Sequence, residues 1–236
     1  MTVQSSSFFK RMLRFIGKSI KWFFIISVVS VVVFKWLPVP MTPLMLWSLP
    51  KQMLNSERKL RLKKDWESIE NISPNLQLAV VCSEDQNFLK HNGFDLVAIK
   101  KALKNNERGR KIKGGSTISQ QTAKNVFLLP TRSYIRKAFE VYFTFLIELI
   151  WSKERILEVY LNVIEFGDGI YGAEAASRQF FHKSTKDLSR EEAALLASVL
   201  PNPIKYKAEN PSSFINRRKR WVVRQMRMWG NHLPME

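Results

Sequence analysis

The sequence predicts a mainly α-helical protein with one globular domain behind a single N-terminal transmembrane helix. Apolar residues recur at helical spacing through residues 94–103, 117–129, 134–164, 189–200 and 215–229, whereas the alternation typical of β-strands is almost absent. One apolar run near the N-terminus is long enough to cross a bilayer core. With 236 residues, the chain has room for one sizeable domain and an appendage, not for two full catalytic domains.

The N-terminal part predicts a basic tail, residues 1–19, and a membrane anchor, residues 20–37. The run from Trp22 to Phe34 is uncharged and largely apolar, and it reaches residue 37 if Lys35 extends toward the headgroups. The cations that precede the run are Lys10, Arg11, Arg14, Lys18 and Lys21. Such an excess keeps its flank cytoplasmic and places the rest of the chain outside the inner membrane. A cleaved signal peptide is the rival interpretation, but no small-residue cleavage site follows the run.

Residues 38–72 predict a membrane-proximal linker and helix, and residues 73–236 the globular domain. The first part, to residue 52, is rich in proline yet apolar, which favours irregular backbone, and residues 57–67 are a charged helix candidate. The interval 134–166 is apolar on nearly all sides. We favour a long, buried core helix there, and the alternative is a surface that dips into lipid.

Charge and cysteine content restrict the classes of partner and site. The net charge of +18, from 38 Lys and Arg against 20 Asp and Glu, indicates an anionic partner such as nucleic acid, phospholipid or a phosphorylated substrate. Cys82 is the only cysteine, so the chain can form no internal disulfide and no thiol-rich metal site. The histidines lack metal-ligand spacing.

Two adjacent carboxylates, Glu84 and Asp85, are candidate catalytic acids. They follow the apolar run LAVVC, so a buried element would deliver both to the edge of a cleft. Desolvation and like charge there raise one pKa toward a useful value. Acid pairs at helix starts are more often caps, so this pair alone does not establish catalysis.

A glycine turn leads into a predicted helix in the segment KGGSTISQQTAKN, residues 113–125. The free N–H groups of such a helix start, with Ser116 and Thr117, suit an anion, and Lys124 follows two turns later. The segment is not a P-loop, because Gly115 stands where that motif needs lysine. A capped helix with a polar face is the equally weighted alternative.

Four charged residues follow at spacings that place them on one helical face: Arg132, Arg136, Lys137 and Glu140. Such a ladder is by itself more often a set of surface salt bridges. Beside the Ser-Thr helix start it would instead form a phosphate clamp, because guanidinium groups bind phosphate oxygens in a bidentate manner.

These segments, in this order, resemble the signature motifs of glycosyltransferase family 51, the peptidoglycan glycosyltransferases, and the chain length matches the monofunctional biosynthetic members. The motifs here are EDQNFLKHNGFD, GGSTISQQTAKN, RKAFE, KERILEVYLNVIEFGDGIYGAEAAS, KSTKDLSREEAALLASVLPNP and NRRKRWVV. The chain departs from the usual pattern at Thr122, where an aliphatic residue is commoner, at Phe139, where Lys is frequent, and at His182, where Gly is usual.

The resemblance implies a lysozyme-like glycosyltransferase domain that transfers, with inversion, a growing undecaprenyl-pyrophosphate-linked glycan to the 4-hydroxyl of lipid II. Glu84 would be the general base, and Asp85 would orient its site. Sugar and pyrophosphate would be bound by Ser116, Gln120, Gln121, Lys124, Asn125, Arg132 and Arg136. Glu140 would either position the arginines or hold Mg²⁺ or Mn²⁺, and the resemblance does not make a metal an absolute requirement.

Two other classes of function are weighed against this one. A lysozyme-like lytic enzyme would cleave finished peptidoglycan, but a hydrolase needs neither the cation cluster nor the anchor. A nucleic-acid-binding protein would use the segment RRKRWVVRQMR, but an exported domain argues against it. Transpeptidation is excluded, because no K-T-G or K-S-G element follows a Ser-x-x-Lys.

The resemblance also predicts partners and location. The partners would be lipid II, undecaprenyl-linked glycan, membrane lipid, and proteins of cell-wall synthesis and division, with no nucleic acid. The protein would be a single-pass inner-membrane protein with a cytoplasmic N-terminus and a periplasmic catalytic domain.

Overall fold

The computed structural model describes residues 3–54, 60–100, 115–230 and 232–234, and it divides into two compact units, residues 1–37 and 38–236. The first unit contains one helix, α1 (Val3–Val33), followed by a turn. Its part from Phe8 to Val33 is long and apolar enough to cross a membrane. The helix thus covers the described part of the predicted tail and ends before residue 37.

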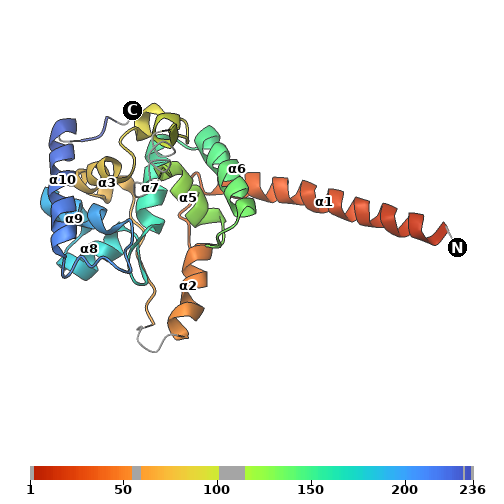
Figure 1. Ribbon diagram of the computed structural model, residues 1–236, viewed down its shortest axis with the longest axis horizontal. Helices are drawn as coiled ribbons and strands as arrows, with labels where there is room; N and C mark the ends of the chain where they lie inside the picture. Colours follow the sequence, from red (N-terminus) through yellow and green to blue (C-terminus); the bar gives the residue numbers. More distant parts are fainter. Residues whose placement is uncertain (1–2, 55–59, 101–114, 231, 235–236) are drawn as a thin grey trace. The chain divides into compact units, whose positions relative to one another are not determined.

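The second unit is mainly α-helical, which confirms the predicted fold class (Figure 1). Its α-helices in the described segments are α2 (Pro43–Met53), α3 (Pro74–Glu84), α5 (Ile118–Phe127), α6 (Tyr134–Ile150), α7 (Lys153–Val163), α8 (Ala173–Phe181), α9 (Arg190–Val199) and α10 (Ser213–Trp229). Short 3₁₀ helices lie at η1 (Ile69–Asn71), η2 (Phe88–Lys90) and η3 (Thr185–Asp187).

A small three-stranded sheet joins β1 (Lys63–Lys64), β3 (Ile170–Tyr171) and β2 (Glu165–Gly167) in that spatial order. Strand β1 pairs with β3 in parallel, and β2 pairs with β3 antiparallel. Gly169, in the turn between β2 and β3, has φ +70°, and a Cβ there would lie 2.1 Å from the carbonyl oxygen of Arg61. Glycine is therefore required for this close approach.

The structure differs from the predicted linker. Residues 43–53, where we expected irregular backbone, form α2, because the Thr42 hydroxyl accepts from the Met45 N–H at 3.3 Å and Pro43 occupies the first turn, which needs no N–H donor. Residues 60–67, the described end of the predicted charged helix, contain β1 and irregular backbone instead. Residues 57–59 lie outside the described residues.

The predicted long helix of residues 134–164 is two helices, α6 and α7. Helix α6 ends at Ile150, and Trp151 has extended backbone. The hydroxyl of Ser152 then caps α7 by accepting from the Arg155 N–H at 3.1 Å. A new cap can satisfy the free N–H groups of a helix start, so a continuous apolar pattern does not guarantee a continuous helix.

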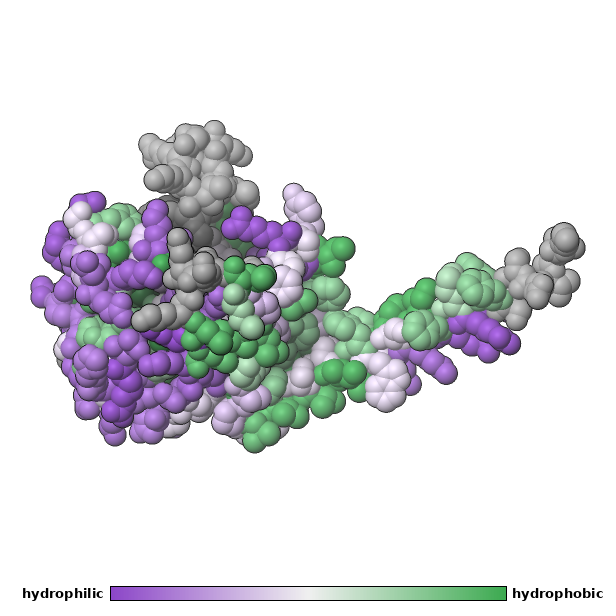
Figure 2. Space-filling view, turned by 90° about the horizontal axis from the view of Figure 1, so that it is seen from below, coloured by the Kyte–Doolittle hydropathy of each residue, from purple (hydrophilic) through white to green (hydrophobic). Residues whose placement is uncertain are grey.

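Helix α6 is also not the buried core helix that we favoured. One face is buried and carries Phe143, Leu146 and Ile147. Other apolar side chains are exposed, namely Tyr134, Ile135, Phe139, Val141, Phe145 and Leu149. Within unit 38–236, Figure 2 shows apolar residues gathered on one part of the visible face and hydrophilic residues on another.

The core of the second unit has two helix groups. Helix α3 is enclosed by α9 and α10, and its residues Leu76, Leu78, Val80 and Val81 are fully buried. Helix α5 packs against α6 and α7. The functional residues described next lie where the C-terminal end of α3 meets α5 and α10.

Candidate active site

Glu84 is the last residue of α3, and its carboxylate is held from two sides. Its Oε1 accepts from the Ser83 hydroxyl at 3.1 Å and lies 3.4 Å from Nη2 of Arg218. Its Oε2 accepts from Nε2 of Gln121 at 3.3 Å. Burial raises the pKa of Glu84, while the hydrogen bond from Gln121 and the charge of Arg218 oppose that rise. A carboxylate with a raised pKa is suited to accept a proton near neutral pH.

Asp85 is buried beside Glu84 and connects three parts of the chain. Its Oδ1 and Oδ2 lie 3.0 and 3.1 Å from Nε2 of His91. Oδ2 also accepts from the backbone N–H of Ile118, at the start of α5, at 3.0 Å. The carboxylate thereby satisfies a free donor of that helix. This geometry suits the orienting role predicted for Asp85.

Helix α5 begins with a capping box. The hydroxyl of Thr117 accepts from the Gln120 N–H at 3.2 Å, and Oε1 of Gln120 accepts from the Thr117 N–H at 3.0 Å. The buried side chain of Gln120 therefore turns back to the helix start and does not meet Glu84. Ser116, just before the cap, is exposed. Residues 113–114 of the predicted glycine turn lie outside the described residues.

Gln121 is oriented by a buried tyrosine. Tyr160 of α7 donates its O–H to Oε1 of Gln121 at 3.4 Å, which leaves Nε2 of the amide to face Glu84. Burial raises the pKa of Tyr160 well above its ordinary value, and the nearby Glu84 and Asp85 charges raise it further. The tyrosine therefore stays protonated and acts as a fixed donor.

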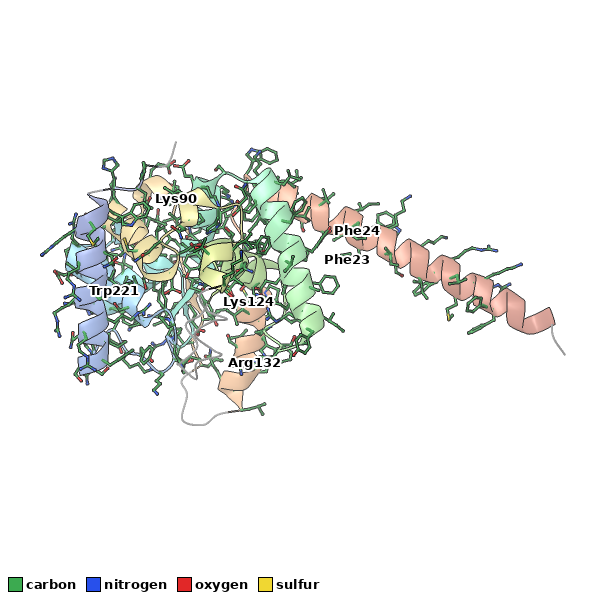
Figure 3. The ribbon with its side chains drawn as sticks, turned by 45° about the horizontal axis from the view of Figure 1, so that its top comes forward. Phe23, Phe24, Lys90, Lys124, Arg132 and Trp221 are labelled. Atoms are coloured by element: carbon green, nitrogen blue, oxygen red, sulfur yellow. The ribbon has the colours of Figure 1, made fainter. Side chains whose placement is uncertain are left out.

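A cationic cavity of about 220 Å³ lies beside α5, about one turn further along the helix than Gln121. It is lined by Leu44, Lys124, Asn125, Leu128, Pro130, Thr131, Arg132 and Arg136. Figure 3 shows Lys124 on α5 and Arg132 in the segment that follows this helix. Among the described residues, Nδ2 of Asn125 and Nε of Arg136 are buried without a hydrogen-bond partner. Both are donors, so the cavity has unused capacity for an anionic ligand.

Burial lowers the pKa of Lys124. The negative charge of Glu140 opposes this shift, and the positive charges of Arg136 and Lys137 add to it. The charge of Glu84 also acts on Lys124. Lys124 therefore interacts electrostatically both with the carboxylate of Glu84 and with the cations of the cavity.

Glu140 is buried on α6 among cations. Its Oε2 accepts from Nη1 of Arg136 at 2.6 Å, and its Oε1 accepts from Nζ of Lys137. The prediction that Arg132 shares this helical face is wrong, because Ser133 caps α6 and the helix begins after it. The cavity nevertheless brings Arg132 beside Arg136.

The surroundings of Glu140 bear on its two predicted roles. Both of its oxygens accept from cations, so its carboxylate is paired with Arg136 and Lys137. A Mg²⁺ ion held by one carboxylate and substrate phosphates needs no group of three protein ligands, so the metal role stays a prediction. The geometry favours the other predicted role, in which Glu140 positions the guanidinium of Arg136.

Sequence reasoning missed three partners of the site, namely Ser83, Tyr160 and Arg218. For Arg218 a signal was available. Ile215, Val222 and Met226 are buried on α10, and Arg218 falls at the same helical spacing. One arginine among the apolar positions of a helix indicates a charge that the fold buries for a reason.

Comparisons with known proteins show what this chain is similar to. A protein-family model described as Transglycosylase matches residues 51–227. The chain is 48% identical over 221 residues to a biosynthetic peptidoglycan transglycosylase of Shewanella oneidensis, covering 94% of each chain. It is 51% identical over 205 residues to the protein of that name from Haemophilus influenzae, covering 86% of this chain and 83% of the relative. The Bacteroides thetaiotaomicron protein of that name is 47% identical over 227 residues, covering 96% and 91%.

Proposed function

We propose, from the premise that this chain belongs to the transglycosylase family and is a peptidoglycan glycosyltransferase, that it polymerises glycan strands from lipid II. The donor would be the growing glycan on undecaprenyl pyrophosphate, and the acceptor the 4-hydroxyl of a new lipid-linked disaccharide-pentapeptide. The reaction would invert the anomeric carbon and release undecaprenyl pyrophosphate. The active site would lie on the periplasmic side of the inner membrane.

Glu84 would be the general base. A sugar hydroxyl is a weak nucleophile, so its oxygen needs to lose a proton as it attacks the anomeric carbon. The raised pKa of Glu84 suits this proton transfer, and Gln121 holds one oxygen of the carboxylate in place. The other oxygen, beside Ser83, would face the acceptor hydroxyl.

The cationic cavity would stabilise the leaving pyrophosphate. Lys124, Arg132 and Arg136 supply positive charge, and the spare donors of Asn125 and Arg136 supply hydrogen bonds. Charge that develops on the leaving oxygens would meet cations already in place. Pyrophosphate stabilised in this way leaves without a strong general acid, unlike the alcohol that departs in glycoside hydrolysis.

The observation that carries the proposal is the position of α5. Gln121 on this helix contacts the carboxylate of Glu84, and Lys124 and Asn125, about one turn later, line the cationic cavity. One rigid helix thus sets the distance between a base and a phosphate site. A transferase with a pyrophosphate leaving group needs both at a fixed separation, whereas a lytic enzyme has no use for the cavity.

The exposed apolar side chains of α6 support a substrate that remains in the membrane. Phe145 and Leu149 are 60% and 69% exposed, which is unusual for large apolar residues grouped on one helix. Glu140, Arg136 and the exposed residues belong to the same helix. The helix could therefore contact lipid while its charged side chains bind the headgroup, the alternative that we weighed for this segment.

The test is a comparison of the wild type with Glu84→Gln, which keeps the shape of the side chain and removes the base. Each detergent-solubilised protein is incubated with labelled lipid II, and products are separated by size. We expect the variant to lose about 10²–10⁴-fold in rate while it still binds substrate. Glu154→Gln, an exposed carboxylate on α7, is the matched control and should polymerise normally.

Two outcomes contradict the proposal. Wild-type protein that leaves lipid II intact but cuts finished glycan strands is a lytic enzyme. Polymer that forms at an undiminished rate with Glu84→Gln means that another group is the base.

A further inference from the structure

Arg218, on helix α10, places its guanidinium against Glu84. Its Nη2 donates to the Ser83 hydroxyl at 2.9 Å and lies 3.4 Å from Oε1 of Glu84. Ser83 itself contacts the same Oε1 at 3.1 Å. Arginine, serine and carboxylate therefore form a closed group around one oxygen of the base, although Glu84 and Arg218 are 134 residues apart in the sequence.

Arg218 does not belong to the solvated basic face of α10. Its neighbours Arg217 and Arg220 are exposed, whereas the side chain of Arg218 is 26% exposed and follows the spacing of the buried Ile215 and Val222. Its Nε is buried, and no hydrogen-bond partner for it exists among the described residues. A guanidinium with an unsatisfied buried donor is a poor source of stability. Its place in the fold therefore needs another explanation.

The surroundings of Glu84 disfavour its ionised form, so a nearby cation is needed to stabilise it. Burial raises the pKa of Glu84, and the like charge of Asp85, the next residue, raises it further. From the helices packed nearby, α7 presents the neutral phenol of Tyr160 and α5 presents Lys124. Lys124 is shared with Glu140, whereas Arg218 of α10 lies directly on Oε1.

We propose that Arg218 is a positioning residue that keeps Glu84 ionised and fixes the direction of its Oε1. This proposal rests on the proposed function, in which Glu84 is the base. Arg218 would act through Glu84 and would not touch the reacting atoms. Because the guanidinium bridges Ser83 and Glu84, it would also stop the carboxylate from rotating away from the acceptor hydroxyl.

The first experiment measures kcat/KM for lipid II polymerisation over about pH 5.5 to 9 in the wild type, Arg218→Gln, Arg218→Lys and the control Arg217→Gln. Without the guanidinium, Glu84 is protonated to a higher pH, so the acidic limb of the Arg218→Gln profile should move upward. The loss should be greatest at low pH, roughly tenfold for each pH unit by which the limb moves, and should shrink at high pH. KM should change little.

The other two variants separate charge from structure. Arg218→Lys keeps a cation on a shorter reach, so its limb should lie between those of the wild type and Arg218→Gln. Arg217→Gln removes one charge from the exposed face and should leave the profile unchanged. A uniform loss at every pH, with an unmoved acidic limb, would show that Arg218 is merely structural and would overturn the proposal.

A second measurement does not depend on activity. Protein labelled with ¹³C at the Glu side-chain carboxyl is titrated by NMR, and the resonance missing from Glu84→Gln identifies Glu84. The pKa of Glu84 should rise in Arg218→Gln, and an unchanged pKa would overturn the proposal. If wild type makes no polymer, the proposed function fails, yet this titration still decides whether Arg218 controls the carboxylate. Should Arg218→Gln not fold, Arg218→Lys gives the same comparison.

Discussion

The pKa values of two side chains of the site are shifted in opposite directions by the same cause. Burial raises the pKa of Glu84 and lowers the pKa of Lys124, because the low-polarity surroundings disfavour the charged form of each. Helix α5 connects the two, because it carries both Lys124 and Gln121, the residue that contacts Glu84. The reaction needs the carboxylate ionised and the ammonium protonated. Both conditions hold together only over a window that burial narrows from both ends.

We therefore predict a bell-shaped dependence of kcat/KM on pH. Activity should be lost at low pH as Glu84 gains its proton, and at high pH as Lys124 loses the positive charge that stabilises the leaving group. Lys124→Arg keeps that charge at all accessible pH values, so its basic limb should disappear or move upward. The measurement is the rate of polymerisation across pH for both proteins.

A control for this prediction is Lys219→Arg, which changes a lysine of α10 outside the cavity. Its profile should match that of the wild type. A basic limb that persists unchanged in Lys124→Arg would assign that limb to another group.

The ends of helices explain several of the local features of the fold. Hydroxyl side chains cap α2, α3, α5, α6, α7, α9 and α10. Helix α8 starts instead at Gly172, which has no side chain to cap it, and ends at His182, which has φ 57°. Only glycine adopts this left-handed conformation without strain. This is the position at which the family pattern usually has glycine, and the structure gives the physical reason.

We predict that His182→Gly stabilises the fold by about 1 kcal/mol, the usual strain of a non-glycine residue in the left-handed region. The free energy of unfolding would be measured by urea denaturation of residues 38–236, which form a compact unit with its own core. His182→Ala is the control, because it removes the ring but not the strain. Equal stabilisation by both variants would mean that the ring, not the backbone, is the source.

Each unit of the whole molecule carries its own feature suited to a membrane. Unit 1–37 contains a helix that is long and apolar enough to span a bilayer. Unit 38–236 exposes Ile135, Phe145 and Leu149 on α6. Because a substrate that stays in the membrane has to meet the active site at the lipid surface, an apolar surface on the catalytic unit is an expected feature of the proposed function.

We predict that residues 38–236, without the first unit, bind vesicles that contain anionic lipid. The double variant Phe145→Ser with Leu149→Ser should bind at least about tenfold more weakly, since burial of each large apolar side chain in lipid is worth about 1.5–3 kcal/mol. Binding would be measured by co-sedimentation. Met228→Ser, which removes an exposed apolar side chain from α10, is the matched control and should bind normally. Undiminished binding of the double variant would mean that α6 does not enter the lipid.

The sequence by itself determined what depends on neighbouring residues: the helical class, the apolar N-terminal run, the capped start of α5, and the acids and cations of the motifs. It did not determine the break at Trp151 or the exposed face of α6, because a run of apolar residues has the same composition whether protein or solvent faces it. Only the tertiary structure placed Arg218 on Glu84, Gln121 on the other oxygen of Glu84, and Asp85 on the backbone N–H of Ile118. These contacts depend on how α3, α5 and α10 pack and on which rotamers that packing allows, and packing between distant segments leaves no periodic signal in a single sequence.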